Sequence, residues 1–418
     1  SLVNILSGGL VRTIISFAAL LVSVGLMQLA NGALGPLDAL SGIYFSFSSF
    51  QIGILGSAHF MGFIFGCVAA PKLLSLIGHV RAFAAFACIG AIGALLHTFT
   101  ENAYFWMVFR IASGMSIAGA FTVIEAWLNA KVTNENRGKV FGAYRAIDLG
   151  GSMLSMLAIG ILEPGNMISY NIIVLLFCFC LLPLTLTTSK PPTLEGFPSL
   201  RPIWAIKLSP LAACGIIVAG ISSPVFRMLG PVFGNDIGLS NSQLGFFLFL
   251  SVLGGVIAQV PVGFISDRFD RRVVLILLSI FAFVVCFCFS LLEDPSLNTL
   301  YILALLFGMF TFPIFSVSSA HANDFVKGDD FINLASSHIF IYSLGAISSP
   351  FLGSLIMERF GSAALFSLIG ISHIFLIIFG VIRMISRPSP NFKTPYLYIA
   401  RTSLILEKIT GRRGQRDE

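Results

Sequence analysis

The chain has 418 residues, of which 25 are Lys or Arg and 19 are Asp or Glu, so 44 charged residues make up only 11%, against about a quarter in soluble domains. Apolar residues make up 56%, Phe alone occupies 41 positions, and the mean hydropathy is +0.93. A folded surface of this composition would aggregate in water, which excludes a soluble enzyme, a soluble nucleic-acid-binding protein and a disordered chain. The seven cysteines lie within apolar runs, and we interpret them as packing residues rather than as disulfides or metal ligands.

Twelve apolar runs follow one another along the chain. A membrane-spanning helix needs about 20 mostly apolar residues, and the twelve runs together hold only five of the charged residues. The sequence therefore predicts an all-α membrane protein with twelve transmembrane helices. The predicted spans are residues 13–35, 48–70, 82–99, 104–128, 140–162, 167–188, 208–232, 243–265, 273–292, 299–320, 333–356 and 363–382.

The basic residues gather in alternate loops. If both termini are cytoplasmic, 21 of the 25 Lys and Arg lie on the cytoplasmic side, three lie within spans and only Arg359 lies outside. Because basic loops stay in the cytoplasm, we expect both termini there, in a bacterial inner (plasma) membrane. The same topology places Asp38 in an outer loop. The net charge of +6 then reflects orientation in the membrane, which removes the argument for binding nucleic acid.

The two halves of the chain repeat. A shift of 192 residues superposes polar and small residues at the start of the second and eighth spans. The matched pairs are Gln51 and Gln243, Gly53 and Gly245, and Gly62 and Gly254. This repeat predicts two pseudo-symmetric six-helix bundles, residues 1–189 and 208–384, with a cytoplasmic linker at 190–207 and a basic cytoplasmic tail at 385–418. Parallel halves of this kind leave a cavity between them near the middle of the bilayer.

The loop after the eighth span carries a family resemblance. It holds a Gly, then an Asp-Arg pair, then two adjacent basic residues, in the order Gly263, Asp267, Arg268, Arg271 and Arg272. This loop resembles the cytoplasmic signature loop of the major facilitator superfamily, with Asp270 in place of the usual second Gly. Arg110 with Gly114, and Arg137 with Gly138, add to the resemblance. The resemblance implies the two-bundle fold, with the first, fourth, seventh and tenth spans lining a central cavity.

The same loop is a candidate gate. A compact turn with a carboxylate and several Arg can pair with helix ends of the other half while the cavity faces outward, since helix ends carry partial charges. The gating candidates are Gly263, Asp267, Arg268, Arg271, Arg272 and Arg137. The alternative is that the arginines only anchor the ninth span by the positive-inside effect. Asp267 favours the gate, because the positive-inside effect explains basic residues in this loop but not an acidic one.

Charges within the spans need a reason, since each costs several kcal/mol. Arg145 and Asp148 are three residues apart on one helix face, and they form either a structural pair or part of a cavity that handles a solute or protons. Glu125 is expected to pair with a nearby Arg or to take part in proton coupling. Arg110 is expected to face or support the cavity, and Arg227 to reach an acidic residue at the outer rim, Asp236.

Uncharged polar residues complete the candidate set for solute binding and ion coupling. Gln28 and Asn31 share a face of the first span. His321 and His338 flank the same predicted cytoplasmic loop, as hydrogen-bonded packing residues or as proton relays.

The function that fits this reading is a secondary transporter that moves a small organic solute by alternating access, with coupling to protons as a hypothesis. The sequence carries no nucleotide-binding loop, no catalytic motif and no metal-ligand cluster, so we expect neither an enzyme nor a cofactor. The expected partners are the solute, membrane lipid and protons, with no nucleic acid, and the expected state is a monomer.

Two alternatives stay open. One is a drug/proton efflux antiporter, which is disfavoured because Gly150 and Gly151 are followed by Ser152 and not by the Pro that such antiporters carry. The other is a non-transporting scaffold or sensor with the same fold, for which the tail offers an interfacial helix or partner site.

Overall fold

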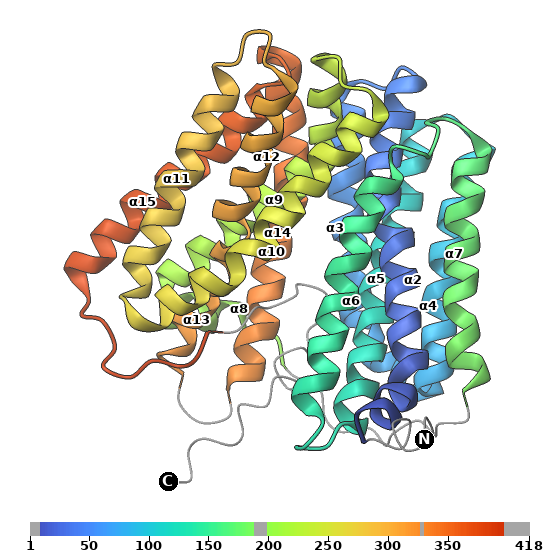
Figure 1. Cartoon of the computed structure of the whole chain (residues 1–418), viewed down its shortest axis with the longest axis horizontal. Coiled ribbons are helices and arrows are strands. Elements are labelled where there is room, and N and C mark those ends of the chain that lie inside the picture. The colour runs from blue at the N-terminus through green and yellow to red at the C-terminus, as the bar shows by residue number, and fades with distance from the viewer. Residues whose placement is uncertain (1–8, 188–198, 327–329, 397–418) are drawn as a thin grey trace, which may run out of the picture.

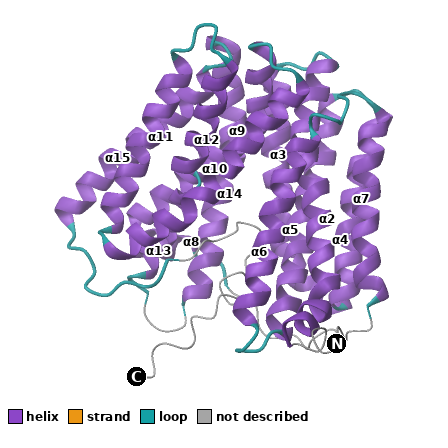
Figure 2. Ribbon diagram, in the orientation of Figure 1, coloured by secondary structure: helices purple, strands orange, loops and turns teal. Residues whose placement is uncertain are grey.

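The computed structural model describes residues 9–187, 199–326 and 330–396, with side chains from Phe17 onward. Every regular element within these ranges is a helix (Figure 2). The helices are α2 (Gly9–Tyr44), α3 (Ser49–Ile77), α4 (His79–Leu96) with the 3₁₀ turn η1 (His97–Phe99), α5 (Ala103–Lys131), α6 (Arg137–Ala158), α7 (Met167–Leu186), α8 (Pro202–Leu208), α9 (Pro210–Asp236), α10 (Asn241–Arg268), α11 (Arg271–Ser290), α12 (Leu297–Thr311), α13 (Pro313–Asn323), α14 (Phe331–Phe360) and α15 (Ala364–Ser386).

The predicted fold is confirmed. Eleven helical segments of the described chain are long and apolar enough to cross a membrane, with α12 and α13 counted as one segment. The remaining long helix is α6, which is less apolar because it carries Arg145 and Asp148. Helices α2 to α7 form one group and helices α9 to α15 form the other (Figure 1).

The repeat in the sequence is also a repeat in structure. Helix α3 begins with a capping box, in which the Ser48 side chain accepts a hydrogen bond from the Gln51 backbone and the Gln51 side chain accepts one from the Ser48 backbone. Helix α10 begins with the same box at Ser240 and Gln243. A capping box satisfies two N–H groups that a helix start leaves without partners. The two halves therefore start their second helix at equivalent residues.

Glycines fix the same helix crossing in both halves. In the first half, Gly62 lies on the backbone of α5 at Ile111, and Gly114 lies on the backbone of α3 at His59. In the second half, Gly254 of α10 lies on the backbone of α12, and Gly308 of α12 lies on the backbone of α10. A Cβ atom at any of these positions would collide with a backbone carbonyl, so the helices can approach this closely only with Gly.

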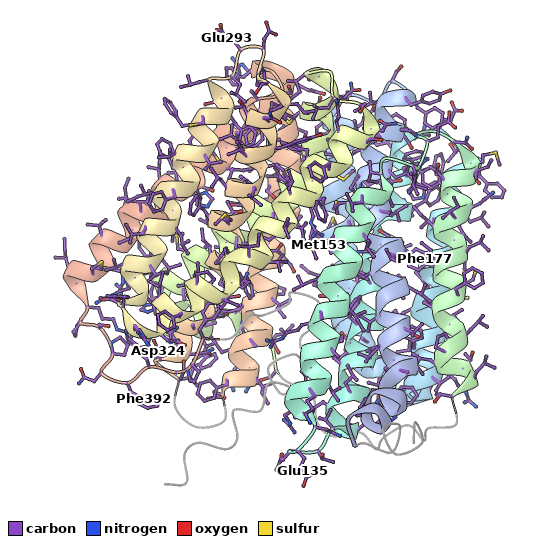
Figure 3. The ribbon with its side chains drawn as sticks, in the orientation of Figure 1. Glu135, Met153, Phe177, Glu293, Asp324 and Phe392 are labelled. Atoms are coloured by element: carbon purple, nitrogen blue, oxygen red, sulfur yellow. The ribbon has the colours of Figure 1, made fainter. Side chains whose placement is uncertain are left out.

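The two halves pack against each other near one end of the helices. Figure 3 labels Glu293 at this end and Glu135 at the opposite end, and we call these ends the Glu293 side and the Glu135 side. On the Glu293 side, Gly53 of α3 packs against Ser354 of α14, and the pseudo-symmetric Gly245 of α10 packs against α6. The backbone N–H of Phe50 also donates to Glu358 at 2.9 Å. Toward the Glu135 side the two groups of helices diverge (Figure 1).

The first helix is longer than the sequence predicts, which corrects the position of Asp38. Helix α2 continues through Pro36 to Tyr44, where a span ending at residue 35 is expected. Asp38 is therefore a fully buried helical residue and not part of an outer loop. In the second half, the predicted tenth span is divided, because Pro313 starts α13 directly after α12.

Candidate functional site

A cavity lies between the two halves. Its volume is about 140 Å³, or about 940 Å³ when the open space at its mouth is included. Aromatic rings form part of its wall, among them Phe60, Phe63 and Tyr342. Its polar lining comes from both halves and consists of Gln28, Asn31, His59, Asp148, Ser152, Ser223, Arg227 and Gln259. Because the halves pack on the Glu293 side and diverge on the Glu135 side, the cavity opens toward the Glu135 side.

Two opposite charges face the cavity from opposite halves. Asp148 of α6 is 5% exposed, and Arg227 of α9 is half-buried. The Arg227 guanidinium donates a hydrogen bond to the Ser152 hydroxyl at 3.0 Å, and its charge acts on Asp148. Arg227 thus points across the cavity toward α6 rather than toward Asp236 at the rim, which corrects the sequence-based expectation. Packing of α9 against the first half determines which face of α9 points into the cavity, and Arg227 lies on that face.

Two side-chain oxygens of residues that line the cavity lack a hydrogen-bond partner. The Oδ1 atoms of Asn31 and Asp148 are buried and accept no hydrogen bond from any residue that the structure describes. Buried polar atoms without partners are costly and are normally satisfied by water or a ligand. Gln28 lies one turn before Asn31 on α2 and also lines the cavity. Together with Asp148, these amides give the first half a polar wall.

Arg110 belongs to a different buried cluster, on the Glu293 side of the first half. Its guanidinium lies 3.7 Å from the carboxylate of Asp38. The same carboxylate accepts a hydrogen bond from the Tyr170 hydroxyl at 2.7 Å and contacts His97 Nε2 at 3.0 Å. The His97 ring stacks on the Tyr170 ring, with centroids 5.2 Å apart. Sequence reasoning missed this cluster because it treated Asp38 as a loop residue, although the mostly apolar residues 37–45 after Pro36 were a signal of a longer helix.

Four further candidates also lie outside the cavity lining. Glu125 of α5 is fully buried and accepts a hydrogen bond from the Tyr144 hydroxyl at 2.5 Å. Arg145 is partly buried on α6, almost one turn from Asp148. His321 is buried in α13. His338 of α14 is buried and shares a hydrogen bond with a Ser hydroxyl of α13, 2.8 Å from its Nδ1. The structure thus brings Gln28, Asn31 and Asp148 together in the cavity and separates the other candidates from it.

The signature loop is held by ion pairs within the second half. Arg271 Nη2 lies 3.3 Å from Asp267, and Arg271 Nε donates to Asp324 at 2.9 Å. Arg272 pairs with Asp270 at 2.7 Å, and Arg268 lies over the ring of Phe264.

Asp270, which replaces the usual Gly of the signature loop, has a local role. Its carboxylate accepts a hydrogen bond from the backbone N–H of Arg272 at 3.0 Å and so caps the start of α11. Partial burial opposes the charged form of Asp270, but the hydrogen bonds and charge of Arg272 outweigh it, and the pKa of Asp270 is lowered.

The chain after α15 folds back along the signature loop (Figure 1), and we call residues 387–396 the C-terminal strap. The backbone and hydroxyl of Thr394 donate to Asp324 at 2.7 and 2.9 Å. The backbone N–H of Tyr396 donates to Asp267 at 2.8 Å, and its hydroxyl donates to the cavity residue Gln259 at 2.5 Å. The strap therefore links the loop candidates to the edge of the cavity, a contact that no sequence pattern indicated.

Comparison with known proteins gives the family. The family model described as Major Facilitator Superfamily matches residues 6–213 and 211–406, so the chain belongs to this superfamily of membrane transporters. An uncharacterized MFS-type transporter of Enterobacter sp. (strain 638) is 26% identical over 364 residues, which cover 86% of this chain and 94% of the relative. The uncharacterized MFS-type transporter YcaD of Escherichia fergusonii is 25% identical over 362 residues, with the same coverage.

Solved structures share the fold at low sequence identity. The nucleoside transporter NupG superposes with a TM-score of 0.74 at 13% identity, covering 88% of this chain and 98% of NupG. A bacterial homologue of the human lysosomal transporter Spinster, inward-facing and unoccupied, superposes with a TM-score of 0.73 at 14% identity, covering 90% of this chain and 96% of the homologue. A D-xylose-proton symporter superposes with a TM-score of 0.71 at 12% identity, covering 91% of this chain and 99% of the symporter. Relatives and neighbours are transporters and not enzymes.

Proposed function

We propose that this protein is a secondary transporter that moves a small polar organic solute across a bacterial inner membrane by alternating access. The observation that carries the proposal is the cavity between the halves, into which Asp148 and Arg227 reach from opposite sides. A solute that contacts both residues bridges the two halves, so its binding can be coupled to their movement. The names of two structural neighbours, a nucleoside transporter and a D-xylose-proton symporter, support a polar solute.

The described conformation is the inward-facing one in this proposal. Among the described residues, the loops of the Glu293 side hold no Lys or Arg, and Arg359 lies beside them in the last turn of α14, whereas Lys72, Arg81 and Arg137 are examples from the Glu135 side. Basic loops stay in the cytoplasm, so the Glu135 side, toward which the cavity opens, is cytoplasmic. Alternation then closes the Glu135 side and opens the contacts of Gly53 and Glu358 on the other side.

The signature loop is the proposed gate. In the described conformation Asp267 and Arg271 bond to each other and to the C-terminal strap, all within the second half. In the outward-facing conformation the loop approaches the helix ends of the first half, where its charges can pair. Arg137, at the start of α6, lies on the same side in the first half.

Proton coupling through Asp148 is part of the proposal. Asp148 is the carboxylate that lines the cavity, and a buried carboxylate that alternately faces both sides can carry a proton. The titratable groups that share the cavity with it are Arg227 of α9, His59 of α3 and Tyr342 of α14, and Arg145 precedes it on its own helix. The drug antiporter alternative uses the same carboxylate, so the test below includes cationic drugs.

Uptake by proteoliposomes tests the proposal. The purified protein is reconstituted, and influx of radiolabelled sugars, nucleosides, amino acids and cationic drugs is measured with and without a pH gradient. We expect saturable influx of at least one solute class, a dependence on the gradient, and loss of that dependence in Asp148→Asn. The matched control is Asp294→Asn, the same substitution in an exposed loop. Failure of every solute to move, in a protein with a normal unfolding transition, would favour the scaffold alternative.

A further inference from the structure

The cavity has a simple charge pattern. Apart from His59, its lining residues include one acidic side chain, Asp148, and one basic side chain, Arg227. The acid comes from α6 in the first half and the base from α9 in the second. The remaining polar groups are amides and hydroxyls, and the walls are largely aromatic and aliphatic. The cavity therefore offers one negative and one positive contact and has no net charge when His59 is neutral.

The two charges lie close together. Arg227 donates to Ser152, and Ser152 follows Asp148 by four residues on α6, so their Cβ atoms are about 6 Å apart. The guanidinium that donates to Ser152 is thus close enough to the carboxylate to act on it electrostatically. The Asp148 Oδ1 atom accepts no hydrogen bond from the described residues, so it can receive one from a ligand.

The pattern discriminates between classes of solute. An anion could bind Arg227 but would be repelled by Asp148, and a cation would meet the opposite conflict. A neutral polyol could hydrogen-bond to both side chains but carries no charge that would pair with either of them. A solute with an ammonium and a carboxylate a few bonds apart would place the ammonium on Asp148 and the carboxylate on Arg227, whose planar fork suits a carboxylate. Buried charges are costly unless paired, and this solute pairs both.

We propose that the solute is a zwitterion of the amino-acid type, with its ammonium group on Asp148 and its carboxylate on Arg227. This inference rests on the proposed function, because it assigns the solute of the same cavity. The amides of Gln28 and Asn31 lie on the wall beside Asp148 and contact polar groups of the solute side chain, while Phe60 and Tyr342 contact its apolar part. Since each half supplies one charge, the bound zwitterion draws the two halves together.

Binding of matched analogues tests the zwitterion. The purified full-length protein is incubated with amino acids, with their N-acetyl forms, which lack the ammonium, and with their amides, which lack the carboxylate. We expect a stabilised unfolding transition with at least one amino acid, and a loss of affinity of roughly tenfold to a hundredfold with either blocked form, as charge-assisted hydrogen bonds are removed.

Two variants assign the contacts. Asp148→Asn is expected to bind the amino acid and its N-acetyl form equally, and Arg227→Gln to bind the amino acid and its amide equally, whereas Asp294→Asn keeps the full discrimination. Equal affinity of the wild-type protein for blocked and unblocked forms, or binding of nucleosides or sugars but of no amino acid, would overturn the inference. Binding of a zwitterion without any influx into proteoliposomes would instead contradict the proposed function and leave the assignment of the site intact.

Discussion

Replacing Asp38 by Asn tests the buried cluster that holds Arg110. The side chains of Asp38 and His97 are fully buried and that of Arg110 is 5% exposed. Asn keeps the shape of Asp38 but removes the negative charge that compensates Arg110. Leaving a buried charge without its partner costs about 3–5 kcal/mol, which exceeds the roughly 1 kcal/mol of a typical neutral hydrogen bond. The charge is therefore expected to dominate the effect.

Thermal unfolding of the purified protein in detergent measures this cost. A loss of 1 kcal/mol lowers the midpoint by about 2–4 °C for a unit of 150–250 residues, so we expect Asp38→Asn to lower it by roughly 10 °C. Asp294→Asn, which removes the same charge from an exposed loop, is expected to leave the midpoint unchanged. Arg110→Gln alone should cost a similar amount, while the double variant of Asp38 and Arg110 should recover most of the loss, because neither charge then remains.

The double variant decides whether the reasoning is right. Additive losses at Asp38 and Arg110, or an unchanged midpoint for Asp38→Asn, would refute a compensating charge pair. A change in solute affinity without a loss of stability in Arg110→Gln would return Arg110 to the solute site.

Three further predictions concern the helix crossing, the strap and the cap of α11. Gly62→Ala is expected to reduce the yield of folded protein, because a Cβ collides with α5, whereas Gly142→Ala, with open space around it, should not; size-exclusion chromatography compares the two. Asp324→Asn should weaken the three hydrogen bonds that Asp324 accepts from Arg271 and from Thr394 of the strap. Hydrogen exchange at residues 388–396 should then be faster, and unchanged exchange would contradict the described contacts. The folded-state pKa of Asp270 is lowered from an ordinary value of 3.8. The stabilising effect of its charge is therefore complete above that pH and is lost as the pH falls further. Asp270→Asn should be less stable than the wild type at neutral pH, and its stability should fall less than that of the wild type below about pH 4.

The sequence predicted most of the fold but less of the site. The repeat at Gln51 and Gln243 correctly predicted two equivalent helix starts, because capping is a local interaction within four residues. Gln28, Asn31 and Asp148 were candidates from their polarity within apolar spans, and they line the cavity. Arg110 was a candidate for the same reason, yet it lies in another cluster, since polarity within a span does not say which helix face meets the cavity.

The amino-acid sequence by itself determined which segments enter the membrane, how many there are and that they form two related halves. Each of these follows from hydropathy and spacing along the chain, which are local properties. Only the tertiary structure decided the partners of the buried charges: Asp38 meets Tyr170, 132 residues away, and Arg227 meets Ser152, 75 residues away. A buried charge takes the partner that helix packing brings within a few ångströms, and packing depends on the whole set of helix faces at once.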